Sequence, residues 1–574
     1  MKSKFCKPVI EALEPRALLS ASVTPSASIA QPPSYALLGG NLNSPSDRVE
    51  DFPFVDLVKT TLGFYNLAGR QANNGQIDFA HTDSNGWPTE DFSFAAEDRS
   101  EFGDAMPAGN YAMSFYGPAG VTVAVRRNAP DPAAQVPAGA PVPTLHQLSY
   151  NASTYLYTFN VTVPQGVLVL AFDFHHTQGK VKNIKVLQAG YSLSSYPTFS
   201  TQYLNLLEDL SPGVIRLMDF THTNGNPVAN WADRTKTTSA TQSRASAPGE
   251  LQPLKGAAWE YGIQLANTLH ANIWVNIPAH ATDDYVTQLA TLLRKTLDPS
   301  LSIYVEYSNE VWNSGQEQYS YNHQVASNEV VSMAKAGQTS TLNYDHLAVN
   351  TSVASGGANA DIWADRRYAR RSRQISILFQ NAWTSAGLAS PTNTRVRTIL
   401  CSQFANASRF DNMLKFISAV YGPPSKYFYG IGVAPYLDLA ADSSKNGLTT
   451  DQVIADLSAD ADRYLTNGAF AGIVSRAQKY GLKPVAYEGG VDTFGPNSIA
   501  AKQAASLDPR IQNIITGFLN TWYSDGGTLF NWYALGGRSY NSPYGTYSIS
   551  DDITNLDEPK ELAFKAIRDQ ALGG

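Results

Sequence analysis

The sequence has almost no cysteine, with two residues in 574. Cys6 falls in the N-terminal segment and Cys401 in an apolar stretch typical of a strand, so we expect no disulfide in the mature chain. No apolar run is long enough to cross a bilayer. The sequence therefore predicts a protein without a membrane span.

Charge is also scarce, because only 16% of the residues are charged and the formal net charge is −7. Such a surface does not suit a polyphosphate, so we expect no nucleic-acid partner. The signatures of serine hydrolases, zinc proteases, phosphate-binding loops and Cys-x-x-Cys sites are missing too. We predict no cofactor, no metal and a monomer. Aromatic residues make up 11% of the chain, and with Asn and Ser they suit a neutral polysaccharide or oligosaccharide.

The N-terminal 21 residues carry lysines but lack the apolar core of an ordinary secretory signal. Residues 13–19, with the sequence LEPRALL, resemble the LEPR-XLL sorting motif of large bacterial surface and exported proteins. The resemblance implies a targeting segment over 1–21 and an extracellular or cell-surface location. The alternative is a short N-terminal helix of the fold. Residues 22–50 are rich in Ser, Pro, Ala and Asn, which predicts a disordered linker.

From residue 51 to 187 the apolar residues alternate with polar ones, with Gly, Pro and Asn clusters between the runs. This pattern predicts an all-β, sandwich-like domain. Trp87, Phe92 and Tyr155 are candidates for stacking on sugar rings. We favour the alternative that they pack the core of the sandwich or its seam with the barrel. The expected strands are Tyr111–Tyr116, Val121–Val125, Thr154–Val163, Val167–Phe174 and Val181–Leu187.

Past residue 188 the spacing becomes helical, and helices alternate with short apolar strands. After the strand that begins at Ile303, the pattern ends in Asn309, Glu310 and Trp312. An acid at the carboxyl end of a barrel strand is where (β/α)8 enzymes hold catalytic groups, so we predict that Glu310 is a catalytic acid/base. The other expected strands are Val214–Phe220, Asn272–Ile277, Arg395–Ser402, Tyr429–Ala434 and Thr528–Trp532.

Two of these strand ends resemble a known family. Residues 308–313, SNEVWN, resemble the strand-4 signature of the clan A retaining glycoside hydrolases, whose acid/base is the Glu of an Asn-Glu pair. Residues 483–490, KPVAYEGG, are similar to the strand-7 element that carries the nucleophile, here Glu488. The resemblance covers roughly the last two thirds of the chain. It implies an α/β fold with a (β/α)8 TIM barrel over 188–574, preceded by the sandwich-like domain of 51–187.

The resemblance also implies a reaction, the hydrolysis of β-linked glycosidic bonds in a neutral polysaccharide with retention of configuration. Retaining enzymes hold the two carboxyls about 5 to 5.5 Å apart, and inverting enzymes about 6.5 to 9.5 Å apart. The charge of the nucleophile raises the pKa of its neighbour, which keeps the acid protonated. Asn309 is a candidate donor to the sugar 2-hydroxyl. Since strict alternation would turn Asn309 and Glu310 to opposite faces, we expect a bend or bulge there.

Arg216 stands on a strand that should be buried, where its charge needs a carboxylate partner. In the resembling clan an Arg on strand 2 supports the nucleophile, and Arg216 matches that position. The alternative is a structural pair with Glu306 or Asp219.

Three further side chains are expected at the rim of the barrel. His280 lies on a loop after a strand and is a candidate donor to a sugar hydroxyl. A metal site formed by His280, Asp283 and Asp284 explains these residues less simply than helix capping by the acids. Tyr436 and Trp532, each at a strand end, are expected to touch the nucleophile or form the floor under the sugar, with barrel packing as the alternative.

Residues 337–360 are rich in Ser, Gly, Ala and Asn and are expected to be an insertion that walls the cleft. The arginines between 366 and 373 are expected to form a solvated, ion-paired face. Two other functional readings stay open. One is a non-catalytic, surface-displayed carbohydrate-binding protein on a barrel scaffold, and the other treats both glutamates as structural.

Overall fold

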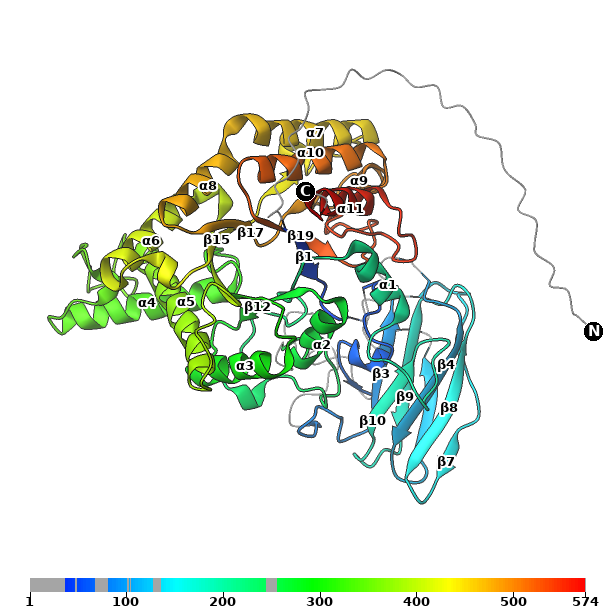
Figure 1. Cartoon of the computed structure of the whole chain (residues 1–574). Helices are drawn as coiled ribbons and strands as arrows, with labels where there is room; N and C mark the ends of the chain where they lie inside the picture. Colours follow the sequence, from blue (N-terminus) through cyan, green and yellow to red (C-terminus); the bar gives the residue numbers. More distant parts are fainter. Residues whose placement is uncertain are drawn as a thin grey trace, which may run out of the picture.

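The computed structural model describes residues 37–572 apart from 47–48, 68–80, 101–102, 104, 127, 129–135 and 244–254. Within these residues, eight parallel strands pair side by side into one closed barrel, which helices surround (Figure 1). The predicted α/β fold with a (β/α)8 barrel is therefore confirmed. In the order in which they pair, the strands are β1 (Leu37–Leu42), β11 (Val214–Arg216), β12 (Asn272–Ile277), β13 (Ile303–Tyr307), β14 (Val396–Cys401), β15 (Gly430–Val433), β17 (Lys483–Ala486) and β19 (Leu529–Leu535).

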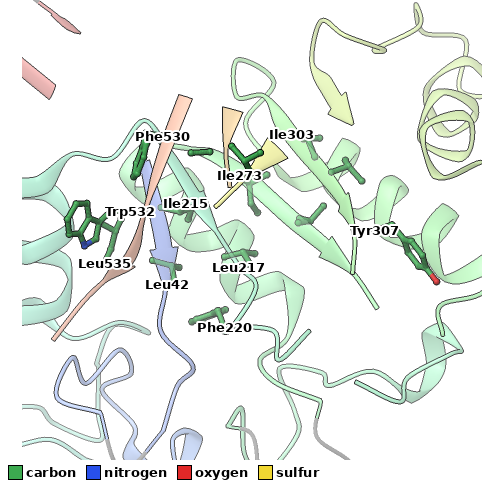
Figure 2. Close-up of a cluster of buried hydrophobic side chains, with 14 of the residues drawn as sticks. Leu42, Ile215, Leu217, Phe220, Ile273, Ile303, Tyr307, Phe530, Trp532 and Leu535 are labelled. Carbon is green, nitrogen blue, oxygen red and sulfur yellow. The ribbon is translucent and has the colours of Figure 1, made fainter. Parts of the chain in front are cut away.

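The barrel strands are apolar on both faces, as a sheet covered by helices requires. Ile273 and Ile303 belong to the large apolar cluster between strands and helices (Figure 2). Trp274 and Tyr304 belong to a separate cluster and stack on each other with ring centroids 5.4 Å apart. The surrounding helices are α1 (Thr201–Leu210), α2 (Trp259–Leu269), α3 (Asp283–Thr296), α4 (Glu317–Lys335), α5 (Ala360–Thr384), α6 (Ser408–Tyr421), α7 (Thr450–Asn467), α8 (Ala469–Lys479), α9 (Ile499–Ser506), α10 (Arg510–Ser524) and α11 (Pro559–Leu572).

The first barrel strand corrects the predicted domain boundaries. Leu37–Leu42 lies in the segment expected to be a disordered linker, yet β1 pairs with β11 on one side and β19 on the other. Its glycines mark close approach of neighbouring strands: a Cβ on Gly39 would lie 2.5 Å from the Val214 carbonyl oxygen. The linker prediction is thus wrong over 37–42, and the barrel does not begin at 188. The predicted targeting segment, 1–21, lies outside the described residues.

The sandwich-like domain is inserted in the connection between β1 and α1. One sheet has the order β2-β3-β9-β5 and the other β10-β4-β8-β6, with β7 pairing to β8. Trp87 and Phe92 are buried in its aromatic core, as favoured from the sequence, whereas Tyr155 is 60% exposed. Its strands are β2 (Tyr65–Asn66), β3 (Phe92–Asp98), β4 (Gly109–Tyr116), β5 (Thr122–Arg126), β6 (Thr144–Leu145), β7 (Ser149–Asn151), β8 (Leu156–Val163), β9 (Val169–His175) and β10 (Lys182–Leu187).

The position of this insertion matters for function. Because β1 is followed directly by the sandwich, the domain grows from the end of the barrel at which parallel strands finish, which is where barrel enzymes bind substrates. Two short parallel strands, β16 (Tyr436–Asp438) and β18 (Gly490–Asp492), pair just beyond β15 and β17 at the same end.

The arginine-rich helix α5 differs in part from its predicted solvated face. Arg366 is buried and pairs with Asp345, and Arg367 is buried with its guanidinium bonded to Asn322. Arg370 pairs with Glu329 near the surface, as expected. In the described part of the chain, no helix is both long and apolar enough to cross a membrane.

Candidate active site

The site is organised around Arg216, the last residue of β11, whose side chain is fully buried inside the barrel. A guanidinium has five N–H groups, and Arg216 makes five hydrogen bonds. Nε and Nη2 donate to Glu306 Oε2 at 3.2 and 2.8 Å, and Nη2 also donates to Asn309 Oδ1 at 2.7 Å. Nη1 donates to Asn41 Oδ1 at 2.8 Å and to Glu488 Oε2 at 3.0 Å.

These bonds reach both partners that the two alternatives for Arg216 require. It pairs with the structural carboxylate of Glu306, which is fully buried, and it also contacts the predicted nucleophile Glu488. Burial alone would lower the pKa of Arg216, but the carboxylates of Glu306 and Glu488 outweigh it and raise that pKa. The guanidinium is therefore a permanent positive charge beneath the site.

Glu306 accepts hydrogen bonds from three side chains on the two strands β11 and β12. Besides Arg216, Trp274 Nε1 donates to its Oε2 at 3.0 Å and Asn276 Nδ2 at 2.8 Å. Asn276 and Glu306 are direct neighbours in the β12–β13 register, and Arg216 is paired with Trp274 between β11 and β12. The strand register itself thus assembles this charge network.

A sharp turn separates Asn309 from Glu310. Ser308 and Glu310 have φ values of +58° and +44°, in the left-handed region that non-glycine residues seldom adopt. This is the bend that the sequence required. It sends the Asn309 amide down to Arg216, while the Glu310 carboxyl turns toward the cavity.

Glu488 follows β17 and is only 7% exposed. Its Oε2 accepts from Arg216, and its Oε1 accepts from the hydroxyl of Tyr436 at 3.1 Å. Tyr436, on β16, was predicted to touch the nucleophile, and the structure places it in that contact. A carboxylate held by a guanidinium and a phenol is oriented and stabilised in its charged form.

Glu310 has neutral partners only. Asn313 Nδ2 donates to its Oε2 at 2.9 Å, and the Tyr487 hydroxyl lies 3.4 Å from its Oε1. Tyr487 directly precedes Glu488, so Glu310 contacts the residue next to Glu488 in the chain. Glu310 also lines a cavity of about 690 Å³ together with Trp312, Tyr436 and Asp492.

The two glutamates influence each other's protonation. Burial and the neighbouring Glu310 together raise the pKa of Glu488 to about 8, against the lowering effect of Arg216. Burial likewise raises the pKa of Glu310, which has no direct ion pair. Two such groups do not both ionise at the usual pH. Because only Glu488 contacts a guanidinium, we assign the negative charge of the pair to Glu488 and the proton to Glu310.

Two predicted site residues lie elsewhere. His280 Nε2 is 3.1 Å from Glu317 Oε1, and its ring lies against Tyr321; none of these contacts involves the glutamate pair. Trp532 is fully buried and donates from Nε1 to the Tyr547 carbonyl. The prediction that Trp532 touches the sugar is therefore wrong, since barrel packing covers the ring.

Several functional side chains escaped the sequence analysis. Asn41 connects Arg216 to the Tyr487 and Trp532 carbonyls, and it was missed because β1 was read as linker. Tyr547 packs edge-on against Tyr436 and Tyr533, in a loop without periodic pattern. Asn41 and Asn276 could have been found as site residues, because each is an amide near the end of a short apolar segment.

The acids near His280 act as helix-terminal groups. Thr282 caps α3 by accepting from the Tyr285 N–H, and Asp283 and Asp284 lie in the first turn. In the described residues, no three His, Cys, Asp or Glu side chains are grouped as metal ligands.

No protein-family model matches the chain, and no curated protein is similar to it in sequence. Among solved structures, it is similar to an α-L-arabinofuranosidase from Thermotoga maritima in an arabinose complex. The identity is 13%, the TM-score is 0.37, and the match covers 66% of this chain and 65% of that one. The chain thus spans less than two thirds of that neighbour.

A rhamnosyl-glucuronidase from Fusarium oxysporum matches at 13% identity and a TM-score of 0.35, covering 65% of this chain and 64% of that one. An endoxylanase from a sugarcane soil metagenome matches at 9% identity and a TM-score of 0.29, covering 64% of this chain and 93% of that one. Likenesses this weak carry no argument, and the barrel is established by its own strand pairing.

Proposed function

We propose that this chain is a retaining glycoside hydrolase that cleaves β-linked bonds of a neutral polysaccharide. The observation that carries the proposal is that two carboxyl groups at one end of the barrel have different hydrogen-bond partners. Glu488 receives the guanidinium of Arg216 and the hydroxyl of Tyr436, whereas Glu310 has neutral donors and lines the cavity. One acid is thereby prepared to be an anion and the other to be a proton donor.

In the first step, the Glu488 carboxylate attacks the anomeric carbon as the bond from that carbon to the leaving oxygen breaks. Glu310 transfers its proton to the leaving oxygen, which departs as an alcohol. The products on the enzyme are a glycosyl ester of Glu488 and an ionised Glu310. With one negative charge removed by ester formation, the pKa of Glu310 falls, which suits it for its next role.

In the second step, water attacks the anomeric carbon of the ester from the face that the leaving group vacated. Glu310 takes a proton from this water, and the bond between the sugar and Glu488 breaks. Arg216 and Tyr436 stabilise the carboxylate that is released. Two inversions at one carbon give net retention of configuration. Asn309, fixed by Arg216 and by a bond from its Nδ2 to Asn224 Oδ1 at 3.2 Å, is the candidate ligand of the sugar 2-hydroxyl.

The proposal is tested with soluble β-glucan, mannan, xylan and galactan and the corresponding aryl glycosides. Wild type, Glu488→Ala and Glu310→Ala are compared, with Glu208→Ala on the exposed face of α1 as a matched control. We expect reducing ends to appear with wild type and the control only. Hydrolysis by Glu488→Ala at the wild-type rate would overturn the proposal.

The second candidate is a carbohydrate-binding protein without turnover. It is favoured by the exposed Tyr155 of the sandwich domain, a side chain of a type that stacks on sugars. Binding of a polysaccharide by wild type and Glu488→Ala alike, with no product from either, would support it.

We also propose that the protein acts outside the cell or at its surface. The support is the LEPRALL sequence of residues 13–19. Fractionation of the producing cells, with and without residues 1–21, tests the location: loss of the exported fraction on deletion is expected, and unchanged export would contradict it.

A further inference from the structure

Two aromatic side chains stand in solvent on adjacent loops at the catalytic end of the barrel. Phe494, after β18, is 57% exposed, and Tyr544, in the loop after β19, is 52% exposed. Most other aromatics of the barrel are buried in its clusters. Large apolar groups left exposed side by side mark binding surfaces more often than chance exposure does.

The two loops are joined so that these side chains face away from the junction. The hydroxyls of Thr493 and Thr546 share a hydrogen bond at 3.0 Å, and Gly495 N donates to the Pro543 carbonyl at 3.0 Å. Phe494 lies between two residues that face the other loop. The Phe494 side chain is largely exposed, whereas Thr493 is buried at the junction.

A buried lysine fixes the loop that carries Phe494. Lys502 is 1% exposed, and its Nζ donates to the carbonyls of Gly495 at 3.0 Å, Ser443 at 3.1 Å and Phe494 at 3.4 Å. An ammonium group bound by three carbonyls holds the backbone in one conformation. The backbone that presents Phe494 is thus fixed before a ligand binds, so its ordering costs little conformational entropy on binding.

The surface is continuous with the candidate active site through Asp492. Phe494 N donates to Asp492 Oδ1 at 2.8 Å, and the Tyr547 hydroxyl donates to the same oxygen at 2.7 Å. Asp492 lines the cavity that contains Glu310, and the Tyr547 ring packs on Tyr436, the partner of Glu488. One residue, Thr493, separates Phe494 from Asp492 in the wall of that cavity.

We propose that Phe494 and Tyr544 form a sugar-binding subsite on the rim of the cleft. They stack on pyranose rings of the same neutral polysaccharide chain whose scissile bond lies between Glu310 and Glu488. The faces of pyranose rings that carry axial C–H groups are apolar and flat enough to cover exposed aromatic rings. This inference rests on the proposed function and extends it, because a subsite beyond the reacting sugar selects polymers over short glycosides.

The test compares Phe494→Ala, Tyr544→Ala and the double variant on a soluble polysaccharide and on an aryl glycoside of the same sugar. For the double variant we expect kcat/KM on the polymer to fall about tenfold, as loss of two stacking contacts predicts. The fall on the aryl glycoside should be at least several times smaller. Leu388→Ala, which truncates a 48% exposed side chain on the α5–β14 connection, is the matched control. Equal losses on both substrates, or no loss on the polymer, would overturn the subsite.

Binding without turnover separates this inference from the proposed function. Affinity electrophoresis in gels containing the same polysaccharides compares Glu488→Ala with the triple variant Glu488→Ala, Phe494→Ala, Tyr544→Ala. Retardation of the first and not the second supports the subsite even if wild type hydrolyses nothing. Equal retardation refutes the subsite even if wild type is active. If neither binding nor hydrolysis occurs on any of the four polysaccharides, both proposals fall.

Discussion

The Arg216 guanidinium lies 3.0 Å from Glu488 Oε2 and 2.8 Å from Glu306 Oε2, so one buried cation serves a strand-4 and a strand-7 carboxylate at once. A purely structural pair would need only Glu306. The second contact supplies a fixed positive charge to the carboxylate that we propose as nucleophile, in a site shielded from water.

Replacing Arg216 by Met removes this charge and leaves Glu306 buried without its cation. Loss of one partner from a buried ion pair costs about 3–5 kcal/mol, and we expect a fall of that size in the free energy of unfolding, measured by urea titration. Arg510→Met is the control, because its guanidinium is half exposed at 51% and pairs with Asp508. Water screens that surface pair, so its loss should change the free energy of unfolding far less. Equal effects of the two changes would contradict the buried network.

Tyr436→Phe keeps the ring against Tyr547 and removes only the hydroxyl that donates to Glu488. A hydrogen bond to a charged group contributes about 1.5–3 kcal/mol, so kcat should fall about 10- to 100-fold. Unfolding in urea should change little. A variant with full kcat would show that the phenol does not support the nucleophile.

The pH dependence of kcat/KM should be bell-shaped. Burial raises the pKa of Glu310, so this acid stays protonated above its usual pH range, and activity falls as the pH rises through that raised pKa. Activity falls on the acidic side as Glu488 takes up a proton. With an aryl glycoside whose leaving group needs no proton, Glu310→Gln should lose the alkaline limb. A retained alkaline limb would assign it to another group.

Protonation of Asp51 should make the stability of the fold depend on pH. Burial raises its pKa to about 7, and its Oδ1 has no hydrogen-bond partner. Since an unfolded Asp titrates near pH 4, the folded state holds the extra proton, and stability is lost as the pH rises from about 4 to about 7. Asp51→Asn should flatten this slope and be more stable than wild type at pH 8. The exposed Asp569→Asn should leave the slope unchanged.

Because β1 closes the barrel, the shortest chain that folds as a barrel must include it. A chain that begins at residue 51 lacks Leu37–Leu42 and leaves β11 and β19 without their shared neighbour. We expect its helical signal in circular dichroism to show no cooperative thermal transition, because the helices pack on the barrel, whereas a chain that begins at residue 35 should unfold like the full chain. A cooperative transition in the shorter chain would contradict the assignment of β1.

Much of the candidate site could be predicted from the sequence, because its two acidic residues follow the ends of short apolar segments. Glu310 and Glu488 each follow a short buried strand, and strand ends of a parallel barrel converge on one rim. The two strand-end motifs therefore placed both glutamates without any knowledge of distances.

Other features depend on contacts between distant parts of the chain. Gly39 and Gly40 lie in the segment predicted to be a disordered linker, yet these glycines allow close strand approach. Trp532 reads as a rim aromatic, yet the loop carrying Tyr547 covers it. Arg366 and Arg367 read as surface charge, yet both are buried and bonded to Asp345 and Asn322.

The most direct test is azide rescue of the two alanine variants on an activated aryl glycoside, with the anomeric configuration of the products determined by NMR. If Glu488 is the nucleophile and Glu310 the acid/base, Glu310→Ala with azide yields a glycosyl azide of the same configuration as the substrate, and Glu488→Ala yields the opposite one. The reverse pattern would exchange the two roles. Failure of azide to rescue either variant, with wild type active, would contradict a double displacement through these two glutamates.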